Sequence, residues 1–147
     1  MSNILDPITT VANAVVALMS SDSALSGYNW QGWESDADVA LPRGYVNVEA
    51  STPLVDENSP MQFEIQVIFE GKPKKLSPSV AVAEVIGQIN RADLATALES
   101  KMIDTSVTFM NRQAENVRVR QQVVGDIRRR TISFTLFGHW NVQWSPP

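Results

Sequence analysis

The sequence has no cysteine and only one histidine among its 147 residues. Without cysteine there can be no disulfide bonds and no thiolate metal sites, and the redox compartment of the protein stays open. His139 lies between Gly138 and Trp140, and no thiol is available to form a nucleophile pair with it. We therefore expect His139 to be a structural residue near the end of a strand.

Short motifs that bind phosphate or activate a serine are also missing. None of the patterns G-x-x-x-x-G-K, G-x-G-x-x-G and G-x-S-x-G occurs in the chain. Two acidic segments, Asp36-Ala37-Asp38 and Asp56-Glu57-Asn58, lack the spacing of a calcium loop and are better interpreted as solvated loop acids. We predict no enzymatic activity, no cofactor and no metal, although a Ser–His–Asp triad assembled from distant positions stays open at this point.

Long hydrophobic runs are absent as well, since no segment approaches the roughly 20 apolar residues of a membrane span. Apolar residues make up 44% of the chain and charged residues 19%, which is typical of a globular protein. A chain of 147 residues is long enough for one domain with one sizeable core. We predict a single domain over residues 1–147 and no contact with a membrane.

Charge is unevenly divided along the chain. Residues 1–71 contain ten acids and one base, giving −9, whereas residues 72–147 contain eleven bases and six acids, giving +5. Ordinary scatter explains this division about as well as function does. The functional alternative is a subunit with one acidic and one basic surface, which would suit head-to-tail contact with copies of itself.

Apolar residues at helical spacing predict helices over residues 7–19 and 78–90 and a short one over 93–99. The first helix begins at Asp6-Pro7, where an aspartate cap precedes a proline that needs no amide partner. Alternation of apolar and polar residues predicts strands over residues 45–50, 61–69 and 104–111.

Residues 21–43 are long, acidic and irregular, and they contain Trp30 and Trp33. An irregular stretch of that length in a compact domain is usually a functional loop or an arm. The two tryptophans more often pack on their own domain than on a partner. A short tail over residues 141–147 ends in Trp-Ser-Pro-Pro.

Residues 116–137 give the clearest local pattern, a β-hairpin. Gly125-Asp126 is a two-residue turn signal of type II′, and a turn there pairs Val124 with Ile127, Val119 with Ile132 and Val117 with Phe134. One face is then apolar at its base and turns basic toward the tip. The arginines of the hairpin are Arg118, Arg120 and Arg129 on the polar face and Arg128 and Arg130 on the apolar face. A ribbon of this kind, continuing past its own core, predicts a contact with a partner.

Nucleic acid is a weaker candidate for that partner. The protein is acidic, with a sequence pI near 4.9, and the hairpin lacks the interleaved exposed aromatic residues of a single-strand platform. Arg129 also points away from Arg128 and Arg130, so the three arginines do not form one patch. Subunit contact, or a plain solvated face, is favoured.

The predicted order of elements is helix, two strands, helix, three strands. We predict an α+β fold, with a mostly antiparallel β-sheet and helices packed on one face, in a single domain. This order resembles the tail terminator (tail completion) proteins of long-tailed bacteriophages. The resemblance rests on the N-terminal helix and on four segments: PRGYVNVE (42–49), QFEIQVIF (62–69), SPSVAVAEVI (77–86) and RTISFTL (130–136). The chain departs from shorter members of that family in its loop over residues 21–43 and in its Trp-Ser-Pro-Pro end.

The resemblance implies a structural virion protein. Such proteins form a ring, usually a hexamer, on the last ring of the tail tube, where they stop tube growth and present a surface to the head. The implied partners are copies of the chain itself, the tail tube protein and the head connector or stopper protein; DNA could pass through the ring without specific recognition. The implied location is the head-proximal end of the tail or the neck of the virion, assembled in the host bacterial cytoplasm.

Nine residues are candidates for the subunit or partner interface: Arg118, Arg120, Arg128, Arg129, Arg130, Asp56, Glu57, Trp30 and Trp33. Three alternative functions stay open. They are another neck, head-completion or tail-tube component, a nucleic-acid-binding accessory protein, and a small enzyme that uses His139 and loop acids.

Overall fold

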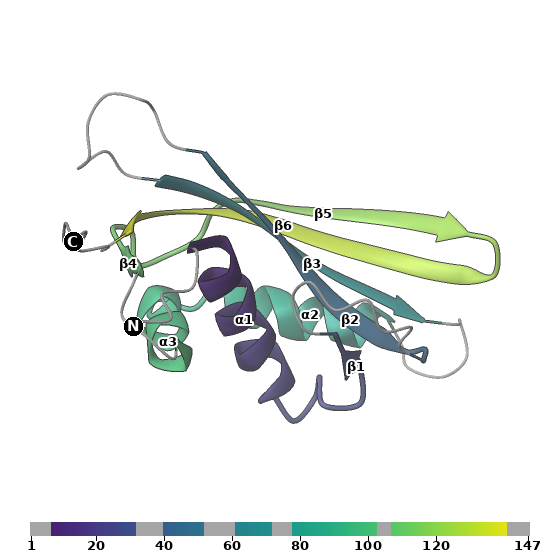
Figure 1. Ribbon diagram of the computed structural model, residues 1–147. Coiled ribbons are helices and arrows are strands. Elements are labelled where there is room, and N and C mark those ends of the chain that lie inside the picture. The colour runs from purple at the N-terminus through teal and green to yellow at the C-terminus, as the bar shows by residue number, and fades with distance from the viewer. Residues whose placement is uncertain (1–6, 32–39, 52–60, 72–77, 103–106, 141–147) are drawn as a thin grey trace, which may run out of the picture.

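The structure is a computed structural model that describes residues 7–31, 40–51, 61–71, 78–102 and 107–140. It confirms the predicted α+β fold, with the helices on one face of a mostly antiparallel sheet (Figure 1). In chain order the elements are α1 (Pro7–Ser20), β1 (Asn29–Trp30), β2 (Arg43–Ser51), β3 (Met61–Gly71), α2 (Pro78–Ile89), α3 (Leu94–Lys101), β4 (Val107–Phe109), β5 (Glu115–Val124) and β6 (Ile127–Trp140).

Strand β6 organises the sheet, whose order is β1-β2-β3-β6-β4. One edge of β6 pairs with β3 along eleven residues, from Gly71↔Arg128 to Met61↔Gly138. The other edge pairs with β5 near the hairpin turn and with β4 near Trp140. Among the described strands, only β1 runs parallel to its neighbour, and the other pairs are antiparallel. The face of the sheet away from the helices is called the outer face below.

The core lies between the helices and the inner face of the sheet. Alternation along β3 puts Phe63, Ile65 and Val67 there at 0% exposure, as predicted. Phe63 meets Phe109 of β4 edge to face, with ring centroids 6.1 Å apart. Both predicted helical stripes contribute to the same core, through Val11, Ala12, Val15 and Met19 of α1 and Val85 and Ile89 of α2. Burial of these apolar side chains is what holds the helices on the sheet.

The segment after α1 is more ordered than predicted. Leu25 and Tyr28 are buried in the core, and β1 adds to the edge of β2 through the bonds from Asn29 N to Pro42 O (2.8 Å) and from Gln31 N to Gly44 O (2.7 Å). A two-residue strand has too little alternation to be recognised from sequence. The remainder of the predicted loop, residues 32–39, lies outside the described residues.

Candidate assembly surface

The predicted hairpin is present and turns at Gly125-Asp126. Val124 pairs with Ile127 and Val119 with Ile132, as predicted. Gly125 has a φ of 65°, which glycine adopts without steric cost, and the positive φ at the first turn residue fits type II′. Turn chemistry and alternation therefore fixed the same register over most of the hairpin.

One predicted pair, Val117 with Phe134, is wrong. The register shifts between Glu115, which faces Thr135, and Arg118, which faces Ser133. Asn116 and Val117 thus share the place of one residue, and Asn116 has a left-handed φ of 55°. Asparagine tolerates that conformation better than most residues, so it is a suitable site for the bulge. Val117 still packs against the core as a partly buried residue.

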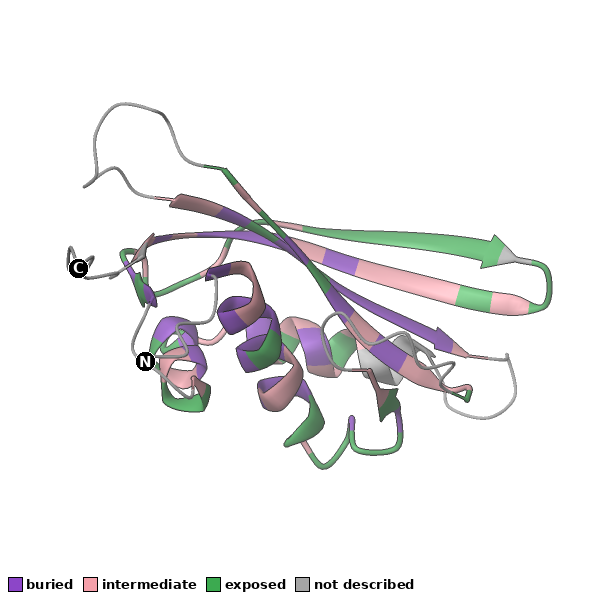
Figure 2. Ribbon diagram, viewed as in Figure 1, coloured by how far each residue is buried: buried purple, intermediate pink, exposed green. Residues whose placement is uncertain are grey.

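The arm, defined here as residues 118–128, is the least covered part of the described sheet. All six residues from Arg118 to Val123 are exposed, which means that the described residues cover this part of β5 on neither face. Figure 2 shows this as an exposed strand beside a half-buried β6. Val119 is 48% exposed and Val123 67%, which is unusual for large apolar side chains. An edge strand with both faces open is available to a partner.

The five hairpin arginines do not act as one group. Arg118, Arg120 and Arg128 are exposed on the arm. Arg129 points to the outer face and binds Glu70, with 3.0 Å between Arg129 Nη2 and Glu70 Oε2. Arg43 Nε holds the other oxygen of Glu70, Oε1, also at 3.0 Å. One arginine predicted for a partner is thus engaged within its own subunit.

Arg130 is half-buried on the inner face, where it pairs with Phe69 of β3. Its Nε is buried and has no hydrogen-bond partner among the described residues. Tyr28 lies within its electrostatic influence: burial raises the pKa of the Tyr28 hydroxyl, and the Arg130 charge partly opposes that rise. Arg130 is therefore part of the rim of the core rather than of the open arm.

The outer face carries acids at the end of the sheet away from the arm tip. Glu49 faces Glu64 across β2 and β3, Glu64 faces Thr135, and Thr135 faces Glu115. The three glutamates, called the acidic row below, are all exposed. A groove of about 300 Å³ is lined by Glu49 and Glu64 of this row, together with Arg118 and Asn116. Sequence reasoning missed this row because its members come from three separate strands.

Trp30, a predicted interface candidate, packs on its own domain. Its indole Nε1 donates to Leu25 O at 3.0 Å, and its ring lies so close to Gly44 that a Cβ there would be 2.7 Å from two ring carbons. Gly44 is thus a position where close approach requires glycine. The other tryptophan candidate, Trp33, and the acids Asp56 and Glu57 lie outside the described residues.

His139 is half-buried and pairs with Thr108 of β4 near the end of β6, as expected for a strand residue. Within the described ranges, no group of three or more His, Asp or Glu side chains could hold a metal ion. The same part of the chain contains no helix long and apolar enough to cross a membrane.

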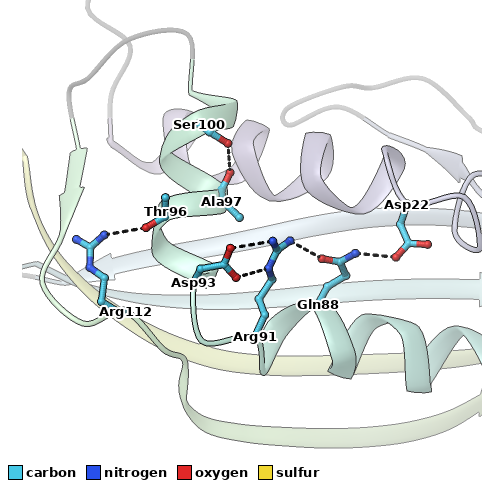
Figure 3. Close-up of polar contacts among 8 residues, drawn as sticks. All are labelled: Asp22, Gln88, Arg91, Asp93, Thr96, Ala97, Ser100 and Arg112. Carbon is cyan, nitrogen blue, oxygen red and sulfur yellow. Dashed lines mark hydrogen bonds and ion pairs between the residues drawn. The ribbon is translucent and has the colours of Figure 1, made fainter.

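A second polar cluster ties the helices together (Figure 3). Gln88 Nε2 of α2 donates to Asp22 Oδ2 at 2.7 Å, and Gln88 Oε1 accepts from Arg91 Nη1 at 3.0 Å. Arg91 then binds Asp93 with both a 2.7 Å and a 3.0 Å hydrogen bond. The bond from Gln88 lowers the pKa of Asp22, and the bond from Arg91 lowers the pKa of Asp93. These hydrogen bonds all join residues of the chain itself, which indicates a structural role for the cluster.

No family model matches the sequence, and no curated protein gives a significant match. The fold is similar to that of a solved chain described as "Virion of native gene transfer agent (GTA) particle". The two chains are 10% identical, with a TM-score of 0.59, and the alignment covers 90% of this chain and 98% of that one. At such low identity the likeness concerns the fold.

Proposed function

We propose that this protein is a structural component of a virion and acts as a tail terminator: a ring that caps the tail tube, stops its growth and offers a joining surface to the head. The observation that carries the proposal is the fold likeness to a chain of a gene transfer agent virion, because it spans nearly all of both chains. The order of elements that resembles tail terminators supports the same assignment independently.

The arm supports a role in self-assembly. It combines exposed arginines, exposed valines and a strand edge with which no described strand pairs, and none of these contributes to the core of its own subunit. A contact between the arm and a different surface of the next subunit is heterologous, and such contacts close into a ring when the rotation per subunit allows it. Copies of the chain are therefore the first proposed partners, and the tail tube and the head connector or stopper are the next.

Another neck, head-completion or tail-tube component is the alternative within the same class of function. A role in nucleic-acid binding has less support, because the exposed residues of β5 are arginine, valine, glutamine, asparagine and glutamate, with no aromatic side chain on which bases could stack.

Two measurements test the proposal. The mass of the purified full-length chain, measured by light scattering during size exclusion, should correspond to a closed ring. Particles assembled without the protein should appear in electron micrographs as headless tails or as tails of uncontrolled length. Normal particles without the protein, or a monomer that binds oligonucleotides, would contradict the terminator assignment.

A further inference from the structure

We infer that the acidic row, Glu49, Glu64 and Glu115, is the surface on which the arm of a neighbouring copy docks. The inference rests on the proposed ring function and adds to it the identity of the receiving surface.

The first argument is local repulsion within one subunit. Glu49 and Glu64 are directly opposite each other on β2 and β3, and like charges in that position destabilise a sheet. Glu64 accepts a 3.2 Å hydrogen bond from Gln62, a neutral side chain. Among the described residues, no lysine or arginine forms an ion pair with Glu49, Glu64 or Glu115. Within the described part of the subunit, three exposed carboxylates therefore have no ion-pair partner, although Arg118 lines the same groove as Glu49 and Glu64.

The second argument is the separation of opposite charges along the strands. The acidic row meets β6 at Thr135, whereas Arg120 faces Thr131 and Arg128 lies still closer to the turn. At about 3.3 Å per residue, Arg120 is roughly 13 Å and Arg128 roughly 23 Å farther along the sheet. Arg118 lies nearer, in the groove lined by Glu49 and Glu64, but Arg120 and Arg128 lie at the other end from the acids, and this separation is the polarity that head-to-tail contact requires.

The third argument is that both faces of the arm are basic. Arg120 shares the outer face with Thr131, and Arg128 shares the inner face with Ile132, since residues of a strand alternate. Whichever face of the arm lies on a neighbour, it presents an arginine. The occupant that fits the acidic row by charge is thus the arm of a second copy of this chain.

A charge exchange tests the contact with the full-length protein. One variant, Glu49→Arg/Glu64→Arg, makes the receiving surface basic; the other, Arg120→Glu/Arg128→Glu, makes the arm acidic. Each variant alone should raise the concentration needed for half-assembly by about tenfold or more, because attraction becomes repulsion at every interface. Mixed in equal amounts, the two variants should assemble again, since each arm then finds an opposite charge on the other variant.

Matched controls separate charge from folding. Arg120→Lys/Arg128→Lys keeps the charge and should assemble, and Lys101→Glu reverses an exposed base on α3, away from both surfaces, and should also assemble. Glu64→Gln should leave the isolated subunit at least as stable, because it removes the repulsion from Glu49, yet weaken assembly.

The outcomes distinguish the two proposals. If the wild type forms a ring and both reversed variants form it too, the proposed docking on the acidic row is wrong and the proposed ring function stands. If the wild type forms a dimer and each reversal dissociates it, the proposed ring is wrong. The contact between arm and acidic row then stands, as a reciprocal exchange of arms between two subunits. A wild-type monomer at all accessible concentrations overturns both.

Discussion

Glu70 is the acid whose environment differs most from what its place in the sequence suggests. It follows the apolar residue Phe69 at the end of β3, and only 3% of it is exposed. Its two oxygens accept hydrogen bonds from Arg43 and Arg129, so a buried carboxylate is held between two guanidinium groups. A buried charge is tolerated only when it is paired in this way. The arrangement also means that part of the charge division along the chain is neutralised inside one subunit.

Replacing Glu70 should therefore destabilise the monomer. Glu70→Gln removes the charge that both arginines bind, and we expect the free energy of unfolding to fall by about 1–3 kcal/mol, a range that takes account of the partial exposure of both arginines. Urea titration measures the change. Glu64→Gln, on the exposed outer face of the same strand, should alter stability by no more than about 0.5 kcal/mol. Equal effects of the two substitutions would show that the Glu70 ion pairs do not stabilise the fold.

Asp22 offers a test by pH. Its pKa is lowered from the ordinary 3.8, chiefly by the hydrogen bond from Gln88. A carboxyl whose pKa is lower in the folded state contributes stability above the unfolded-state pKa and loses it as the pH falls through the folded value. In Gln88→Met, NMR titration should find the pKa of Asp22 shifted upward, and the acid-dependent part of stability should shrink. The pKa of Asp93, held low by Arg91, should stay low in the same variant.

At the level of elements, the long periodic segments could be predicted from sequence, whereas residues that depart from the periodic pattern could not. Helices α1, α2 and α3 and strands β2 and β3 follow directly from their apolar spacing, because burial of one face determines where they lie. Within β3, Ile68 is also buried, at 6% exposure on the outer face, although alternation assigns it to solvent. That burial depends on neighbouring strands, which a single segment of sequence does not specify.

Some features of the candidate site could likewise be predicted from local sequence, and others could not. The turn and the exposure of Arg118, Arg120 and Arg128 follow from local pattern. The engagement of Arg129 by Glu70 joins residues 59 positions apart, and the acidic row joins three strands, so both depend on tertiary pairing. The bulge at Asn116 lies close to the place where the pairing of β6 passes from β5, at Thr135, to β4, at Gly138, and the local sequence did not predict it.

Strand β3 supplies the core prediction. Phe63 is fully buried and packs against Phe109, so Phe63→Ala should leave a cavity and lower the free energy of unfolding by roughly 3–5 kcal/mol. Val123→Ala, on the exposed side of the arm, should change it by less than about 0.5 kcal/mol. Denaturant titration of both variants checks the contrast. A loss below about 1 kcal/mol for Phe63→Ala would show that its side chain is not part of the core.

For the molecule as a whole, two kinds of contact have to be weighed. Exposed ion pairs are worth only about 0–1 kcal/mol each, so the arm arginines alone cannot supply the affinity of a ring. The exposed Val119 and Val123 can add apolar burial, and repeated charges can set partner choice and encounter rate. Charged residues on an edge strand have another ordinary role, since they discourage edge-to-edge aggregation. Salt separates these roles, because screening acts on charge pairs and leaves apolar contact in place.

Added salt should have opposite effects on the assembly of the wild type and of the variant with a reversed arm. In the wild type, the proposed contact joins the basic arm to the acidic row, so raising salt toward 1 M should weaken or slow assembly as the screening length falls to about 3 Å. In Arg120→Glu/Arg128→Glu the same surfaces repel, so added salt should partly restore assembly. Sedimentation velocity across a salt series measures how the assembly of each protein changes with salt. Lys101→Glu is a control that should follow the wild type. Wild-type assembly that is insensitive to salt, together with a reversed variant that behaves identically, would leave the arm arginines as the ordinary solvated edge of a sheet and assign ring formation to apolar contact alone.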